Sequence, residues 1–331
     1  MKPDKKRVLG ILQGVSLGDA MGMPTEVLPQ ELIHEKFPNG IHELLGSVSG
    51  GPYKRDLPAG SITDDTVNTL LVCKMLIKNN GKIDSRQFIE SLIRWTQDSN
   101  MAQYVAGPST KSAIKAIQNG LPLEKAGITG TTNGAAMKIS PVGIVFDYKN
   151  ASALLKAVSA ICMPTHNTSI AIAGASAIAA IDSYVARGGT KISTIWQIAT
   201  DFAQKGSIYG FKFPSADLVF RINQAKAIVQ TSRTRTVLLS RLYQEVGSGM
   251  ETIETIPCVL AIVDFAKADA WKAAQLAAEI GWDTDTIGSI ATGICGGIHP
   301  DSIPISKIAQ IEKVNKIELN SISEQLFNVA K

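Results

Sequence analysis

The sequence predicts an all-α fold. Apolar residues recur at helical spacing along nearly all of the 331 residues, and the strict alternation typical of half-buried strands is scarce. Breakers such as Gly188-Gly189 and Gly247-Ser248-Gly249 separate the apolar segments, and the latter predicts a plain turn. The predicted helices span residues 5–20, 64–79, 85–98, 109–119, 151–162, 167–187, 191–205, 214–229, 234–246, 252–267, 269–280 and 286–296.

Local signals support individual helices. In the first, Gly14, Gly18 and Gly22 recur every four residues, which leaves one smooth face that another helix can approach closely. Further along, Asp84-Ser85 precedes an apolar face as a helix cap does, and Pro214-Ser215 opens another helix.

The chain is predicted to fold as one unit. No linker, low-complexity segment or repeat divides it, so we expect a single helical domain over residues 1–304. The polar segment 305–331 is expected to form a peripheral helical tail. The most apolar stretch, 170–181, is too short to span a bilayer and, rich in Ala and Gly, fits a buried helix.

Composition excludes several classes of protein. The formal net charge is +4 and no basic block is present, which argues against a nucleic-acid partner or a membrane partner. The four cysteines lie far apart without a CxxC pair, so a disulfide framework and a zinc site are not expected, and a cytoplasmic location fits. Gln13 and Asp19 interrupt the apolar run that a signal peptide would need.

Two acidic motifs lie at opposite ends of the chain, each before an apolar helical run. A single Thr- and Asp-containing motif most often caps a helix. Two of them together would gather four carboxylates, which are prohibitive to bury near each other without compensating charge. Two divalent cations would neutralise them, and an all-oxygen ligand set favours Mg²⁺ or Mn²⁺ over Zn²⁺. The candidate metal ligands are Thr63, Asp64, Asp65, Asp283, Asp285 and Thr286.

Other segments offer candidate site residues. Asp19, which we place on the glycine face of the first helix, could support the metals. Glu26 follows Pro24 in a loop, as either a substrate-facing carboxylate or an ordinary solvated residue. The small residues after Asn133 leave room for a phosphate or sugar to approach the backbone. His166 precedes the longest apolar helix, and a cap or satisfied core histidine is the simpler interpretation there.

Five segments, in this order, resemble the motifs of the ADP-ribosylglycohydrolase family, which includes dinitrogenase reductase-activating glycohydrolase and the ADP-ribosylarginine and ADP-ribosylserine hydrolases. The resemblance covers about residues 8–300. The segments are GDAMGMPTE, TDDT, NGAAMKISPVG, the Thr-His pair before a helix, and WDTDTIGSIATG.

The resemblance implies a compact single-domain orthogonal helical bundle with two Mg²⁺ or Mn²⁺ ions in a cleft. It implies the six metal ligands named above, with Glu26 and Asp65 as catalytic residues and Asn133, Gly134 and His166 lining an ADP-ribose pocket. The sequence departs from arginine-directed members, because the stretch 104–110 holds no carboxylate that could act as general base. The leaving group, the base and the oligomeric state therefore stay open.

The implied activity is hydrolysis of a glycosidic bond at the anomeric carbon of ADP-ribose attached to a protein side chain or a small molecule. One alternative is a nucleosidase-like hydrolase of a small N-ribosyl metabolite, with the same metals but no need to hold adenine and diphosphate. The other is a relative that binds ADP-ribose without turnover.

Overall fold

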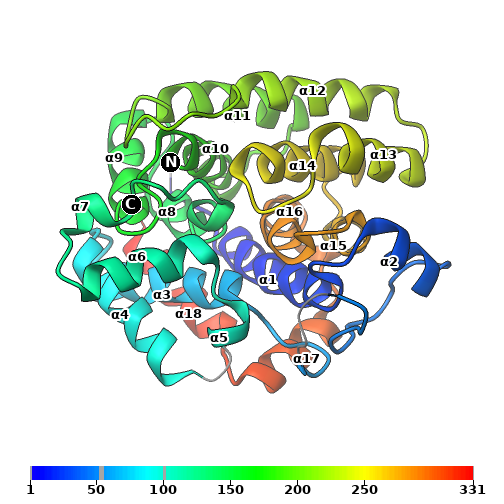
Figure 1. Ribbon diagram of the computed structural model, residues 1–331, viewed down its shortest axis with the longest axis horizontal. Helices are drawn as coiled ribbons and strands as arrows, with labels where there is room; N and C mark the ends of the chain where they lie inside the picture. Colours follow the sequence, from blue (N-terminus) through cyan, green and yellow to red (C-terminus); the bar gives the residue numbers. More distant parts are fainter. Residues whose placement is uncertain (1, 52–55, 100–101, 331) are drawn as a thin grey trace.

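The computed structural model describes residues 2–51, 56–99 and 102–330, and these are helical with no strand among them. The all-α prediction is confirmed (Figure 1). The helices are α1 Lys5–Gly22, α2 Gln30–Lys36, α3 Asp64–Lys78, α4 Ser85–Asp98, α5 Ala102–Val105, α6 Pro108–Gln118, α7 Leu123–Ala126, α8 Ser140–Val145, α9 Ala151–Cys162, α10 Ser169–Ala186, α11 Ile192–Gly206, α12 Leu218–Thr231, α13 Arg235–Arg241, α14 Thr252–Phe265, α15 Ala270–Ile280, α16 Thr284–Ile298, α17 Ile305–Asn315 and α18 Leu319–Val329.

The differences from the predicted helices have local causes. The short helices α2, α5, α7 and α8 were not predicted, because one or two turns show too little periodicity to detect. The predicted helix 214–229 starts later, at Leu218, where the Asp217 side chain accepts a hydrogen bond from the backbone N–H of Phe220. The predicted helix 234–246 is α13 continued by a π-helical turn, Leu242–Val246.

Helices α1 and α16 lie side by side at the centre of the molecule, although they come from opposite ends of the chain (Figure 1). A Cβ added to Gly14 would lie 2.2 Å from the carbonyl oxygen of Thr292, and one added to Gly18 would lie 2.0 Å from that of Gly288. Gly10 and Gly22 face the carbonyls of Gly296 and Thr284 in the same way. The glycine face predicted for α1 therefore packs backbone to backbone against α16, which runs antiparallel to it. The four glycine contacts fix the register of the two helices.

Helix α10 is long and apolar enough to cross a membrane by length and composition, and it is the one such helix in the described part of the chain. Some 89% of its 18-residue apolar window is buried inside the molecule, where it contacts α8, α9, α11 and α16. Its buried small residues allow this close packing, as expected for a core helix.

The C-terminal segment forms α17 and α18. Helix α18 packs on α1, α3 and α8, with Leu319 and Leu326 fully buried, and α17 buries Ile308 and Ile311 beside α1. The domain boundary at residue 304 stays a prediction. The cysteines Cys73, Cys162, Cys258 and Cys295 are all free and buried, as expected for a chain without a disulfide framework.

Candidate active site

The first acidic motif forms the start of α3. Thr63 is the N-cap, and its hydroxyl accepts a hydrogen bond from the backbone N–H of Asp65. The capping interpretation thus holds for Thr63 but not for the two acids that follow. Asp64 and Asp65 are buried, and Asp65 Oδ1 has no hydrogen-bond partner among the described residues. A buried carboxylate oxygen without a donor is unusual in a protein interior and is available to a cation.

The second acidic motif forms the start of α16. Asp283 occupies the N-cap position without making a side-chain capping bond, and Asp285 lies in the first turn. The Thr286 hydroxyl donates to Asp65 Oδ2 at 3.2 Å, which joins the two motifs directly. The backbone N–H of Asp283 donates to the carbonyl of Ser248, so the segment interpreted as a plain turn in fact anchors the start of α16.

Asp19 in α1 holds the start of α3 in place. Its carboxylate accepts from the backbone N–H groups of Thr63, at 2.9 Å, and Thr66, at 3.0 Å, and from the Thr66 hydroxyl at 2.5 Å. The placement of Asp19 on the glycine face was wrong: the glycines contact α16, whereas Asp19 points to α3. Its oxygens are occupied by donors from the protein, which makes it a support for the site.

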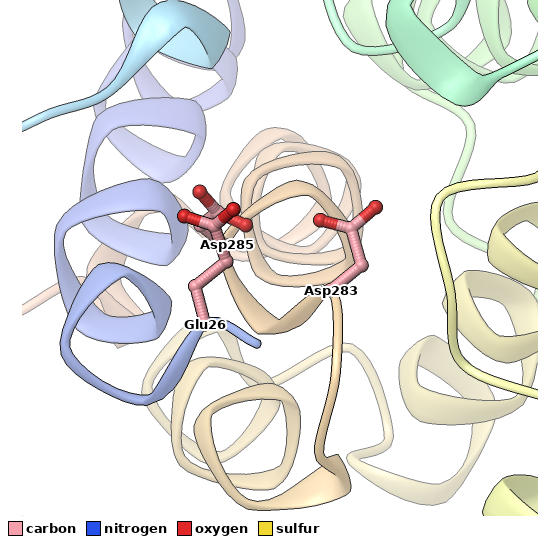
Figure 2. Close-up of side chains that lie close together, drawn as sticks. All are labelled: Glu26, Asp283 and Asp285. Atoms are coloured by element: carbon pink, nitrogen blue, oxygen red, sulfur yellow. The ribbon is translucent and has the colours of Figure 1, made fainter. Parts of the chain in front are cut away.

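Glu26 lies in the loop after α1, half-buried, with its carboxylate directed toward Asp285 (Figure 2). One carboxylate oxygen each of Glu26, Asp283 and Asp285 lie within 4.8 Å of one another. The solvated-loop interpretation of Glu26 is therefore wrong. This trio could hold a metal ion, which makes Glu26 a candidate ligand in addition to the six predicted ones.

The backbone beside this cluster is strained. Val27, which follows Glu26, and Trp282, which precedes Asp283, both have left-handed φ values, of 66° and 62°. Two hydrogen bonds join the segments that carry these residues: Val27 N–H donates to the Trp282 carbonyl, and Trp282 N–H donates to the Leu28 carbonyl. Left-handed conformations are unfavourable for β-branched and bulky residues and tend to occur at functional sites. Here the two left-handed residues and the hydrogen bonds between their segments fix the spacing of Glu26 and Asp283.

Electrostatics disfavours ionisation of the whole cluster in the absence of cations. Burial, with the charges of Glu26 and Asp19, raises the pKa of Asp64 to about 7. Burial also raises the pKa of Asp283 to about 6, and it raises the pKa values of Asp65 and Asp285 well above their usual range, with repulsion between the carboxylates adding to the effect. The donor set, the free oxygen on Asp65 and the close trio all fit hard divalent cations.

Asn133, Gly134 and His166 line the same cavity. Asn133 Nδ2 donates to Asp283 Oδ2 and to the Thr255 hydroxyl, so its amide positions an acidic residue. Both ring nitrogens of His166 have hydroxyl partners, which fits the simpler interpretation of a satisfied buried histidine, although the ring also lines the cavity. A side chain at Gly134 would come within 2.7 Å of that ring.

The cavity brings together the predicted site residues except Asp19 and Thr63. Thr63 is fully buried behind Asp65 and does not reach the wall. The cavity-lining residues are Glu26, Asp64, Asp65, Val105, Gly107, Pro108, Thr110, Thr132, Asn133, Gly134, Met137, His166, Met250, Asp283, Asp285 and Thr286. From the stretch 104–110 the wall thus receives no carboxylate, and the Tyr104 side chain lies outside the described residues.

Lys138, which lies behind this wall, was not predicted from the sequence. The available signal was a charged residue within an otherwise apolar run, Ala135-Ala136-Met137-Lys138-Ile139. It is fully buried.

Known proteins resemble this chain over its full length. The family model for ADP-ribosylglycohydrolase matches residues 1–331. The uncharacterized protein YegU of Escherichia coli (strain K12) is 34% identical over 97% of this chain and 96% of its own length. ADP-ribosylarginine hydrolase Tri1 of Serratia proteamaculans (strain 568) is 24% identical over 97% of this chain and 79% of its own length.

A solved structure shares the fold. The ADP-ribosylglycohydrolase-related protein complex superimposes with a TM-score of 0.73 at 19% identity, covering 99% of both chains. Together with the match of the family model to the whole sequence, this places the protein: the chain belongs to the ADP-ribosylglycohydrolase family.

Proposed function

We propose that this protein hydrolyses the glycosidic bond at the anomeric carbon of ADP-ribose attached to a protein side chain or a small molecule, with two Mg²⁺ or Mn²⁺ ions. The observation that carries the proposal is the convergence of Glu26, Asp64, Asp65, Asp283 and Asp285 on one cavity. Family membership and the similarity to the arginine-directed hydrolase Tri1 support the reaction class.

The residues that would hold the ions are the four aspartates with Thr286, and Glu26 is a further candidate through its contact with Asp283 and Asp285. Bound ions would neutralise the carboxylates and act as Lewis acids toward oxygen atoms of the ribose. Thr63 reaches Asp65 through its hydroxyl, at 3.3 Å, so its contribution is to orient that carboxylate.

The chain's own groups would handle the remaining chemistry. Water adds to the anomeric carbon as the bond to the leaving group breaks, and the departing atom needs a proton. Glu26 faces the cavity at the end of α1, where a carboxyl group can hold that proton and return it. Positive charge develops on the sugar during bond cleavage, and the carboxylates of Asp65 and Asp283 are fixed nearby to stabilise it.

The test is release of free ADP-ribose. The purified chain, with Mg²⁺ and separately with Mn²⁺, is incubated with an ADP-ribosyl-arginine protein, an ADP-ribosyl-serine protein, and plain nucleosides. We expect ADP-ribose from one of the two proteins and none after exhaustive chelation with metal loss confirmed by elemental analysis. Free base from nucleosides alone would indicate the nucleosidase-like alternative, and tight binding of ADP-ribose without any product would indicate a non-catalytic relative.

A further inference from the structure

Lys138 is a fully buried cation behind the cavity wall. Its Nζ donates to the carbonyl of Gly134 and, at 3.4 Å, to the Thr165 hydroxyl, and it lies 5.8 Å from the centre of the Phe88 ring. No carboxylate within the described ranges forms an ion pair with it. A lysine ammonium group has three donors and no acceptor, so Lys138 is the donor in every hydrogen bond that it makes.

The hydrogen bonds continue from Lys138 to the cavity through His166. Thr165 Oγ1 lies 2.8 Å from His166 Nδ1, and Thr132 Oγ1 lies 2.9 Å from His166 Nε2. Thr132 in turn donates to the Ser109 hydroxyl at 3.1 Å. These five side chains therefore form one continuous chain of hydrogen bonds from the buried ammonium group to the half-buried Ser109.

The directions in this chain follow from the lysine. Thr165 accepts from Lys138, and its single proton needs an acceptor because the side chain is buried. Within the described residues His166 Nδ1 is the acceptor in reach. The opposite tautomer would leave the Thr165 proton buried without a partner, at a cost of about 1–3 kcal/mol.

We propose that Lys138 and Thr165 are positioning residues that hold His166 as a neutral imidazole protonated on Nε2, which makes the ring a fixed hydrogen-bond donor on the cavity wall. In this arrangement Nδ1 accepts from Thr165, and Nε2–H donates to Thr132 on the cavity side. His166 is then unable to act as the general base, because its one lone pair in the ring plane points away from the cavity.

Two further observations agree with this assignment. Burial lowers the pKa of His166 well below its usual range, and the Lys138 charge lowers it further, so the imidazolium form is disfavoured. The ring is also held in place, since Gly134 is packed against its Cε1 and Nε2 atoms. Because Nε2–H is donated to Thr132 Oγ1, the defined tautomer leaves the Thr132 hydroxyl, which lines the cavity, with its own proton to donate.

The tautomer is measured directly on the full chain by ¹⁵N NMR of labelled histidine rings, with His166→Gln used to assign the signal among the four histidines. We expect a pyridine-like Nδ1 and a protonated Nε2 throughout the neutral range. A protonated Nδ1, or an imidazolium at neutral pH, would overturn the proposal. This measurement needs no ligand and no activity.

Variants of Thr165 and Lys138 separate positioning from packing. Thr165→Val keeps the shape but removes the hydroxyl, and Thr165→Ser keeps the hydroxyl. We expect Thr165→Val and Lys138→Met to lose the Nε2–H preference, and Thr165→Ser to retain it. The same result in Thr165→Ser as in Thr165→Val would show that packing alone matters and would overturn the proposal.

The role toward a ligand rests on the proposed function and is read by calorimetry with ADP-ribose and Mg²⁺. Thr165→Val should bind about 2–10-fold more weakly than the parent, as expected for the loss of one ordered hydrogen bond, and Thr165→Ser should bind like the parent. Unchanged affinity in Thr165→Val would overturn this role. Failure of the parent itself to bind ADP-ribose would refute the proposed function, while the NMR result would still decide the tautomer.

Discussion

At the scale of single residues, the same side chain serves two purposes in this site. Asp19 and Asp65 are both buried aspartates, but Asp19 accepts hydrogen bonds from Thr63 and Thr66, whereas Asp65 keeps one oxygen without a donor. The satisfied carboxylate organises the start of a helix, and the unsatisfied one is available to a cation. In the sequence both residues are simply Asp, so their different roles depend on which hydrogen-bond donors surround each carboxylate.

For Glu26, removal of the proton function should affect rate more than metal binding. Glu26→Gln keeps size and most hydrogen bonds, so we expect kcat to fall by roughly 10²–10⁴ with little change in metal affinity. Glu31→Gln, an exposed acid in α2, is the control and should change neither quantity. A large loss of metal affinity with unchanged kcat at saturating metal would instead make Glu26 a ligand, as its contact with Asp283 and Asp285 allows.

Asp182 provides a pH test away from the site. It is buried in α10 facing α8, and burial raises its pKa to about 7, although a hydrogen bond from the Ser140 side chain opposes that shift. The folded state therefore holds a proton that the unfolded state releases near pH 4, so this group makes stability fall as pH rises from about 4 to 7.

Replacing Asp182 by Asn removes that titration. We expect the free energy of unfolding of Asp182→Asn to exceed that of the parent at pH 8 by on the order of 1–3 kcal/mol, with the difference vanishing below about pH 4. Chemical denaturation at several pH values measures it. A variant that is less stable than the parent at pH 8 would show that the ionised carboxylate has a stabilising partner.

At the scale of elements, the register of α1 against α16 positions the chemistry. Backbone contact at Gly10, Gly14, Gly18 and Gly22 aligns the end of α1 with the beginning of α16, which brings Glu26 to Asp283 and Asp285. The glycine spacing in the sequence predicted close approach by some helix. It did not identify the partner, because any helix with a small-residue face could have fitted.

Gly18→Ala tests this interface. The added carbon would lie 2.0 Å from the Gly288 carbonyl, a backbone atom that cannot move without displacing α16. We expect a loss of more than about 3 kcal/mol in the free energy of unfolding, at the severe end for overpacking. Gly107→Ala, where nothing lies within 4 Å of the new carbon, is the control and should cost under about 1 kcal/mol. Equal stability of the two variants would refute the close-packing account.

At the scale of the whole molecule, the site exists only when distant segments meet. Asp64 and Asp65 stand at the start of α3, Asp283 and Asp285 at the start of α16, and Glu26 between α1 and α2. The fold holds these like charges together against their repulsion, so a cation that binds them should stabilise the folded state.

Metal binding should therefore be visible in thermal unfolding. Saturating Mg²⁺ or Mn²⁺ should raise the Tm of the parent, by an amount equivalent to about 2.7 kcal/mol at a concentration of 100 Kd. Asp285→Ala should lose this response and all turnover, while the helical circular dichroism of the metal-free forms stays alike. Asp301→Ala, which removes an exposed acid paired with Lys6, should respond to metal like the parent. Near-parental turnover in Asp285→Ala would refute the two-metal assignment.

The sequence by itself determined the helical class, most of the long helices and the residue types of the site. These follow from local periodicity and from short motifs such as Asp283-Thr284-Asp285-Thr286, in which neighbouring residues carry the signal. The tertiary structure alone decided which carboxylates accept hydrogen bonds at both oxygens. It also decided that the Glu26 carboxylate lies close to Asp285 and that Lys138 lies buried behind His166. Each of these depends on groups far apart in the chain, because their distances and burial arise from packing.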